Sequence, residues 1–277
     1  MADVGKLVAL VARLRGADGC PWDREQGLGD LRAYLLEEAH EAAAALDRVT
    51  AGGGGGVGEA AGEALHDAWD ELAGELGDLL FQVAFVLRLG EEAGRLDATA
   101  VVDRVHAKMV GRHPHVFPAA GAAAPRLDDA AAVAAAWEKR KLARGEAPTL
   151  LAGVPESLPA LLAAYRLTQK AAGVGFDWPE APAVLDKVEE EVAELRAELA
   201  AGDAGRLAEE VGDLLFTVAN LARKLGSDPE AALAAANAKF RRRFAAVEAA
   251  LAAAGKRLEE VGLEELDRLW DEVKQDE

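Results

Sequence analysis

Two stretches of the sequence carry the same arrangement of acidic side chains. The acids of the first stretch are Glu38, Glu41, Glu75 and Asp78, and those of the second are Glu191, Glu194, Glu210 and Asp213. Residues three or four apart share one face of a helix, so each stretch places two carboxylates on one helix and two on the next. Carboxylates gathered in this way repel one another unless cations lie between them. Their hard oxygen atoms suit Mg²⁺.

A glycine stands directly before the aspartate in each stretch, at Gly77 and Gly212. Glycine costs about 1 kcal/mol relative to alanine inside a helix, and this alanine-rich chain nevertheless uses it twice at the same place. We therefore expect a helix or a ligand to approach closely at both glycines.

The overall composition narrows the classes of partner. The chain has 277 residues and a formal net charge of −18, which disfavours binding to nucleic acid or to an anionic membrane surface. Cys20 is the only cysteine, so no intramolecular disulfide is possible and a reducing compartment is expected. The sequence has neither a long apolar run nor a signal-peptide pattern at its start. These features together predict a soluble cytoplasmic protein.

Apolar residues recur at helical spacing along most of the chain. No alternating apolar run is long enough to predict a strand, so the predicted fold class is all-α. The predicted helices are 4–15, 30–48, 66–92, 98–111, 128–143, 160–172, 182–200, 205–225, 229–254 and 263–275.

The order of motifs predicts a tandem duplication of helical bundles. Residues 144–159 contain three prolines and little periodicity, which is typical of a domain boundary. We therefore predict a first domain at 1–145, a linker at 146–159 and a second domain at 160–277. The glycine-rich segment 51–63 lacks the Gly-Lys-Ser/Thr ending of a phosphate-binding loop, and a flexible connector is the better interpretation.

Basic and aromatic residues recur in step with the acids. In each half a Lys/Arg pair and then a Trp/Lys pair follow the acids, and the members of each pair are four residues apart. These residues are Lys108, Arg112, Trp137 and Lys141 in the first half, and Lys239, Arg243, Trp270 and Lys274 in the second. Carboxylates can hold a metal ion, Lys and Arg can bind phosphate oxygens, and Trp offers a flat surface to a base. The combination indicates a nucleotide polyphosphate bound through Mg²⁺.

Longer stretches resemble the MazG family of nucleoside triphosphate pyrophosphohydrolases. The matching stretches are GCPWDREQ, LLEEAHEA, ELGDLLFQVAF, RHPHVF, SLPALLAAYRLTQKAAGVGFDW, DKVEEEVAEL, EEVGDLLFTVANLARKLG, NAKFRRRF and LWDEVK. The resemblance implies helical bundles of the all-α NTP-pyrophosphatase type that pair into a homodimer. It also implies Mg²⁺-dependent hydrolysis of nucleoside triphosphates to nucleoside monophosphate and pyrophosphate, with broad base tolerance.

The resemblance also implies a role for individual residues. Metal ligands would be Glu191, Glu194, Glu210 and Asp213, with Glu38, Glu41, Glu75 and Asp78 as the amino-terminal counterparts. Nucleotide contacts would be Lys187, Glu190, Glu191, Arg206, Glu209, Lys239, Arg243, Trp270 and Lys274. The glycine-rich insert departs from the family pattern.

Three of these residues are predicted to act in catalysis. Glu191 and Asp213 would be required through the metal ion. Glu190 is not needed as a ligand and is the candidate for orienting or deprotonating the attacking water. Glu191→Gln and Asp213→Asn are then expected to abolish pyrophosphate release without loss of helix.

Other interpretations of the same residues remain open at this stage. The activity could be specialised for dUTP or phosphoribosyl-ATP, or the chain could be a regulator that binds nucleotide without turnover. Lys239 and Arg243 could instead pair with surface acids, and Trp270 could belong to the core. His113 and His115 flank a proline without the spacing of a zinc site, so a capping turn is the better interpretation.

Overall fold

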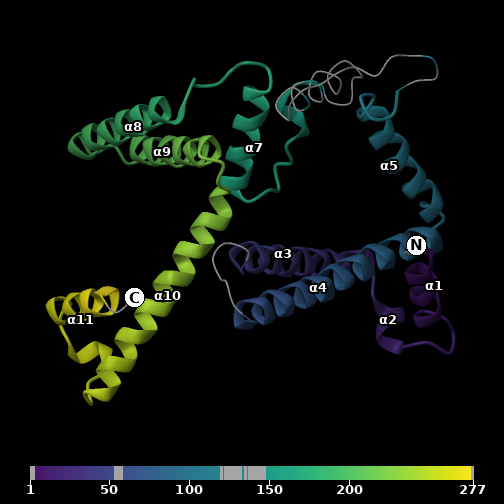
Figure 1. Ribbon diagram of the computed structural model, residues 1–277, viewed down its shortest axis with the longest axis horizontal. Helices are drawn as coiled ribbons and strands as arrows, with labels where there is room; N and C mark the ends of the chain where they lie inside the picture. Colours follow the sequence, from purple (N-terminus) through teal and green to yellow (C-terminus); the bar gives the residue numbers. More distant parts are fainter. Residues whose placement is uncertain are drawn as a thin grey trace. The chain divides into compact units, whose positions relative to one another are not determined.

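All regular secondary structure in the described part of the chain is helical, as predicted (Figure 1). The computed structural model describes residues 4–52, 59–118, 121, 133, 136 and 148–275. The α-helices are α1 (Val4–Leu14), α2 (Pro21–Glu25), α3 (Leu28–Gly52), α4 (Glu59–Glu92), α5 (Ala98–Arg112), α7 (Ala160–Ala172), α8 (Ala181–Ala201), α9 (Ala204–Lys224), α10 (Pro229–Ala253) and α11 (Leu263–Gln275), and the 3₁₀ helices are η1 (Leu151–Gly153) and η2 (Leu258–Glu260).

Most helix boundaries lie close to the predicted ones. The short helix α2 is not predicted, because five residues are too few to show a period. The predicted helix at 128–143, with Trp137 and Lys141, lies outside the described residues. Among the helices that are described, none combines the length and the apolar composition needed to cross a membrane.

The chain divides into two compact units, Met1–Arg126 and Leu127–Glu277. Each unit contains one long helix pair, α3 with α4 in the first and α8 with α9 in the second. These pairs carry the two acidic stretches, so the duplication predicted from the sequence is present in the fold. The domain boundaries proposed from the proline-rich segment remain a prediction.

In the first unit, α3 and α4 lie side by side and run in opposite directions. Leu31, near the start of α3, belongs to the same buried cluster as Phe85, near the end of α4. At the other end of the pair, Val49 of α3 packs with Leu72 of α4. Helix α1 adds Val11, which is fully buried, to the first cluster. This core fixes which faces of α3 and α4 meet.

In the second unit, a tight turn joins α8 to α9. Gly202 ends α8 with a φ of 79°, in the left-handed region that favours glycine. The side chain of Asp203 then caps α9 by accepting hydrogen bonds from the backbone N–H groups of Gly205 and Arg206. Helix α7 packs against α9, and α10 packs against α7 and α11. The turn sets the register between the two acid-bearing helices.

The loop between α7 and α8 is anchored to α9 by a charge network. One carboxylate oxygen of Asp177 lies 2.5 Å from Arg223 Nη2, and the other lies 2.8 Å from Lys224 Nζ. Lys224 also donates to the backbone carbonyl of Trp178. Burial alone would raise the pKa of Asp177, but the hydrogen bonds from Arg223 and Lys224 lower it below its ordinary value of 3.8.

We predict that Asp177→Asn lowers the free energy of unfolding by about 1 kcal/mol at pH 7, because two hydrogen-bonded cations lose their carboxylate. The lowered pKa means that the wild-type advantage is fully present above pH 3.8 and is lost as the pH falls through the folded-state value. Urea unfolding at pH 7 and near pH 3 measures both effects. The exposed Asp267→Asn on α11 serves as the control, and an equal loss at both pH values would contradict the prediction.

Candidate functional site

Three acids predicted from the sequence converge between α8 and α9. Glu191 and Glu194 of α8 and Glu210 of α9 each offer a carboxylate oxygen, and these oxygens lie within 4.8 Å of one another. Glu191 is only 4% exposed, whereas Glu194 is exposed. The i, i+3 spacing on α8 and the turn at Gly202 together produce this arrangement. Asp213 lies one turn after Glu210 on α9 and is exposed; it is not within the closest group.

A lysine neutralises part of this cluster. Lys187 Nζ lies 2.8 Å from a carboxylate oxygen of Glu191 and 2.9 Å from one of Glu190. Hydrogen bonds to Glu191 and then to Glu190 raise the pKa of Lys187, so it stays charged. Glu190 is itself exposed. The buried Glu191 therefore has a cation of its own, while Glu194 and Glu210 form no ion pair with a described residue of the chain.

Both desolvation and the neighbouring acids raise the pKa of Glu210 above its ordinary value. Partial removal from water is the largest cause, followed by repulsion from Glu194, Glu191 and Asp213. Asp213 thus acts on the cluster electrostatically although it lies outside the closest group. A cluster whose charged form is disfavoured in this way is relieved by an added cation. Carboxylate oxygens from two helices are a donor set that suits Mg²⁺.

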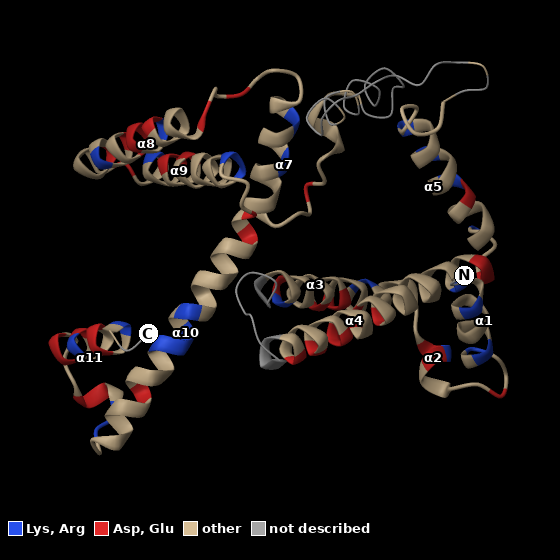
Figure 2. Ribbon diagram, viewed as in Figure 1, with Lys and Arg blue, Asp and Glu red and all other residues tan. Residues whose placement is uncertain are grey.

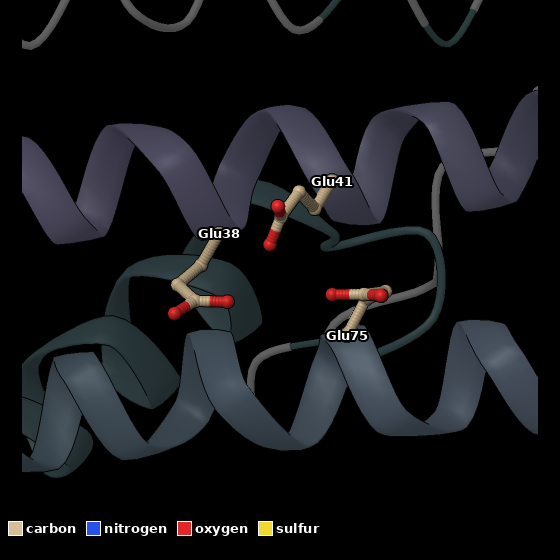
Figure 3. Close-up of side chains that lie close together, drawn as sticks. All are labelled: Glu38, Glu41 and Glu75. Atoms are coloured by element: carbon tan, nitrogen blue, oxygen red, sulfur yellow. The ribbon is translucent and has the colours of Figure 1, made fainter.

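The first unit contains an equivalent cluster. Glu38 and Glu41 of α3 and Glu75 of α4 each offer an oxygen within 4.8 Å of the others. Figure 3 shows the three carboxylates facing one another across the gap between the two helices. Burial, then repulsion from Asp78, raises the pKa of Glu38, and a hydrogen bond from Gln82 opposes the shift. The acid framework is therefore duplicated in space as well as in sequence.

The surroundings of the two clusters differ. When the two units are aligned on their shared acids, three polar residues of the second unit have different counterparts in the first. Tyr34 is at the position of Lys187, Glu71 at that of Arg206 and Gly74 at that of Glu209. Glu71 forms an ion pair with Arg48 at 2.7 Å, so the charge of Arg48 is paired with an acid outside the cluster. The first unit keeps the carboxylates and lacks the lysine beside them.

The other predicted nucleotide contacts of the second unit fall into two groups. Arg206 and Glu209 lie on α9 with the acids, and Arg206 pairs with Glu198 of α8 at 2.7 Å. Lys239 and Arg243 lie on α10, and Trp270 and Lys274 lie on α11. Figure 2 shows basic residues on both helices.

The structure brings the α10 and α11 residues together with one another. The Trp270 ring centroid lies 5.3 Å from that of Phe240, and the Arg243 guanidinium lies 6.0 Å from the Trp270 ring. Lys274 pairs with Asp271. The two predicted pairs, Lys239 with Arg243 and Trp270 with Lys274, thus lie on two helices that contact each other through Arg243 and Trp270. The acids lie on α8 and α9.

Sequence reasoning missed one polar residue of this unit. Asn220 is 1% exposed and lies on α9, seven residues after Asp213. The sequence contained a signal for this residue. Asn220 is a polar residue in the apolar run LLFTVAN, and its distance of seven residues from Asp213 places it on the helix face that carries the acids.

The fold and the paired carboxylate clusters define a duplicated all-α protein in which each half presents converging acids across one helix pair. The chain belongs to the MazG family: the MazG nucleotide pyrophosphohydrolase domain matches residues 26–117 and 181–247, which contain both clusters. This confirms the resemblance drawn from the motifs.

Several curated proteins are similar along nearly the whole chain. The nucleoside triphosphate pyrophosphohydrolase of Escherichia coli K12 is 39% identical over 100% of this chain and 99% of its own length. The nucleoside triphosphate pyrophosphohydrolase/pyrophosphatase MazG of Thermotoga maritima is 36% identical over 97% and 94%. The uncharacterized protein YabN of Bacillus subtilis is 37% identical over 97% of this chain and 51% of its own length.

We predict that Glu210→Gln raises the melting temperature of the metal-free protein at pH 8, because it removes one charge from a repelling cluster. The same variant is expected to lose most of the rise in melting temperature that Mg²⁺ gives the wild type. Thermal unfolding with EDTA and with Mg²⁺ measures both, and Glu248→Gln on the exposed face of α10 is the control. A variant that melts lower without metal and still responds fully to Mg²⁺ would contradict the site.

Proposed function

We propose that this protein hydrolyses nucleoside triphosphates to nucleoside monophosphate and pyrophosphate in a Mg²⁺-dependent reaction at the second unit. The observation that carries the proposal is the convergence of Glu191, Glu194 and Glu210 across α8 and α9, with Lys187 beside them. The names of the Escherichia coli and Thermotoga maritima relatives support the reaction.

The donor set fits the metal. Glu191, Glu194 and Glu210, joined by Asp213 one turn along α9, are the residues that would hold Mg²⁺. When bound, the ion supplies positive charge that polarises the triphosphate and offsets the charge of the acids.

Other residues of the chain are proposed to act in the hydrolysis itself. Water attacks the α-phosphorus, a new P–O bond forms, the bond to the β-phosphate oxygen breaks, and pyrophosphate leaves. Glu190 is exposed at the edge of the cluster and is held by Lys187 at 2.9 Å, so it is the residue assigned to orient that water and accept its proton. Lys239, Arg243 and Lys274 are assigned to the negative charge of the leaving group.

Broad base tolerance belongs to the same proposal. The polar residues around the cluster are suited to phosphate and metal rather than to one base. A specialised activity toward dUTP or phosphoribosyl-ATP is the alternative, and comparable rates on ATP, GTP, CTP and UTP would exclude it. A regulator that binds nucleotide without turnover is the other alternative. It would show nucleotide-dependent stabilisation without pyrophosphate release.

The first unit is proposed to bind a metal ion without turnover. It keeps Glu38, Glu41 and Glu75, but Tyr34 and Glu71 replace the two basic residues of the second unit. A triphosphate would meet fewer cations there.

We predict that Glu191→Gln and Asp213→Asn each reduce pyrophosphate release at least about 100-fold while leaving the helical circular dichroism unchanged. The matched change in the first unit, Glu38→Gln, is expected to leave release within about twofold of the wild type. The measurement is pyrophosphate release from ATP with Mg²⁺. If Glu38→Gln removes the activity and Glu191→Gln does not, the wrong unit has been assigned.

A homodimer is also part of the proposal. Val211, Leu215 and Val218 lie on one face of α9 and are 43% to 52% exposed. The counterpart face of α4, with Leu76, Leu80 and Val83, is 40% to 48% exposed. Exposed apolar faces of this kind are typical of protein–protein interfaces.

The two glycines fit the same interface. A Cβ atom added at Gly77 or Gly212 would meet nothing within 4 Å in the described structure. Of the two expected causes, a helix or a ligand, no helix of the described chain makes the close approach, because no described atom occupies that space. Close approach of a ligand or of a second chain would then explain why glycine occurs at both positions. Both glycines lie next to residues of the exposed apolar faces.

We predict that the wild-type chain sediments as a dimer and that Leu215→Glu shifts it toward the monomer, because a carboxylate would be buried in an apolar interface. Analytical ultracentrifugation measures the mass, and Leu263→Glu, at an 81% exposed position outside this face, is the control. A monomeric mass for the wild type would contradict the proposed dimer.

A further inference from the structure

Lys187 lies on the same face of α8 as two of the converging acids. Glu191 and Glu194 follow it at distances of four and seven residues along the helix, and residues at these spacings share one face. The Nζ atom of Lys187 lies 2.8 Å from a carboxylate oxygen of Glu191 and 2.9 Å from one of Glu190. An ammonium group therefore brings positive charge to the edge of the cluster that is proposed to hold Mg²⁺.

The two members of the ion pair between Lys187 and Glu191 differ in their exposure. The side chain of Glu191 is 6% exposed, whereas that of Lys187 is 30% exposed. A carboxylate buried this deeply needs a cation beside it, so the pair stabilises the cluster. The lysine keeps contact with solvent at the end of a flexible stem. It can therefore change its partner without any unfolding of α8.

Lys187 and a metal ion cannot both neutralise Glu191 without repelling each other. An ammonium group and a divalent ion on one carboxylate lie within a few ångströms, where like charges repel strongly if little water lies between them. The three acids of the cluster each offer an oxygen to one shared ion, whereas Lys187 forms an ion pair with only one of these three described acids. A divalent ion thus gains more from the cluster than the lysine does, and the lysine is the group that is displaced.

The chemistry of the ammonium group indicates what Lys187 would bind next. The group has three donors and no acceptor, so it needs a new anionic partner when the pair with Glu191 breaks. Glu190 remains as one partner, at 2.9 Å. The oxygens of a triphosphate at the metal ion would be the other anion close to the lysine. Displacement from the acid therefore makes Lys187 available to phosphate.

From these observations we propose that Lys187 competes with the metal ion for Glu191 and moves to the triphosphate when the metal ion takes its place. Metal ion and triphosphate then bind cooperatively at the second unit. The metal ion frees the lysine for phosphate, and the triphosphate draws the lysine away from Glu191. The inference rests on the proposed function and adds how the two ligands are coupled. A cluster with a competing lysine binds free metal weakly and the metal–nucleotide complex tightly.

The first unit offers an internal comparison. Tyr34 is at the position of Lys187 and packs against the core cluster that joins α3 to α4. Glu38 accepts a hydrogen bond from the neutral amide of Gln82. A metal ion at the acids of this unit has no lysine at the equivalent position to displace. We therefore expect the first unit to bind free metal ion more tightly than the second, and independently of nucleotide.

Lys187→Met tests the competition, because it removes the charge and nearly keeps the length of the side chain. All proteins in this test carry Glu38→Gln, which weakens the cluster of the first unit. Calorimetry without nucleotide is expected to show Mn²⁺ binding about tenfold more tightly to the methionine variant. A lysine that merely supported α8 would leave this affinity unchanged or lower it when removed. Lys187→Arg keeps the charge and is expected to bind Mn²⁺ within about twofold of its parent.

The affinity for a triphosphate is expected to change in the opposite direction. We use α,β-methylene ATP, in which the bond to be broken cannot be hydrolysed, at saturating Mg²⁺. Its binding to Lys187→Met should weaken about tenfold, because a charged donor to phosphate is lost. Lys256, after the end of α10, also forms an ion pair, with Glu265 at 2.7 Å. Lys256→Met is the matched control and is expected to change neither affinity.

The movement of the lysine can be followed without turnover. Reductive methylation mapped by mass spectrometry reports how readily the amine of Lys187 reacts in the wild-type protein. The amine is expected to react faster at saturating Mg²⁺, because its ion pair with Glu191 breaks, and more slowly again once α,β-methylene ATP is added. The amine of Lys256 serves as the internal control and should react at the same rate in all three states.

Two results would overturn the inference. The first is a Mn²⁺ affinity that is unchanged or lower in Lys187→Met, and the second is a methylation rate of Lys187 that does not respond to Mg²⁺. A wild-type protein that shows both expected responses but releases no pyrophosphate would refute the proposed function and leave the competition at Glu191 standing. Hydrolysis of ATP by a protein that shows neither response would refute the competition alone.

Discussion

The mutual repulsion of carboxylates held between two packed helices is the constraint on which the rest of the structure depends. Glu191 is buried, and Glu194 and Glu210 lie close enough to share one ion. Buried like charges are destabilising unless a cation compensates them. Lys187 compensates only Glu190 and Glu191. The turn at Gly202 and the cap at Asp203 hold α8 and α9 in the register that brings the acids together.

The duplication places one helical framework in two different surroundings. Both units retain the helix pair and the converging acids (Figures 1 and 3). Around this shared framework the second unit has Lys187 and Asn220, where the first has Tyr34 and Phe85. These changes replace two polar side chains by aromatic ones, and Phe85 contributes to the core instead. Only the second unit has a lysine at the position beside the acids, which is why we propose that the nucleotide binds there.

The acids and the helices could be predicted from the sequence because both depend on local periodicity. The spacing of Glu191 and Glu194 places them on one face whatever the rest of the chain does, and the repeat pairs them with Glu210. The contacts that depend on tertiary packing could not be predicted in the same way. The orientation of the Asn220 amide is set by Arg223 and hence by Asp177, forty-three residues earlier. Whether Trp270 faces a base or Phe240 likewise depends on how α11 packs on α10.

The most direct test of the central claim is anomalous diffraction from crystals grown with Mn²⁺ and a non-hydrolysable nucleoside triphosphate. The account predicts an anomalous peak between α8 and α9, coordinated by Glu191, Glu194 and Glu210 and by oxygens of the triphosphate. A nucleotide bound with no metal peak at these acids, or a peak confined to Glu38, Glu41 and Glu75, would contradict it.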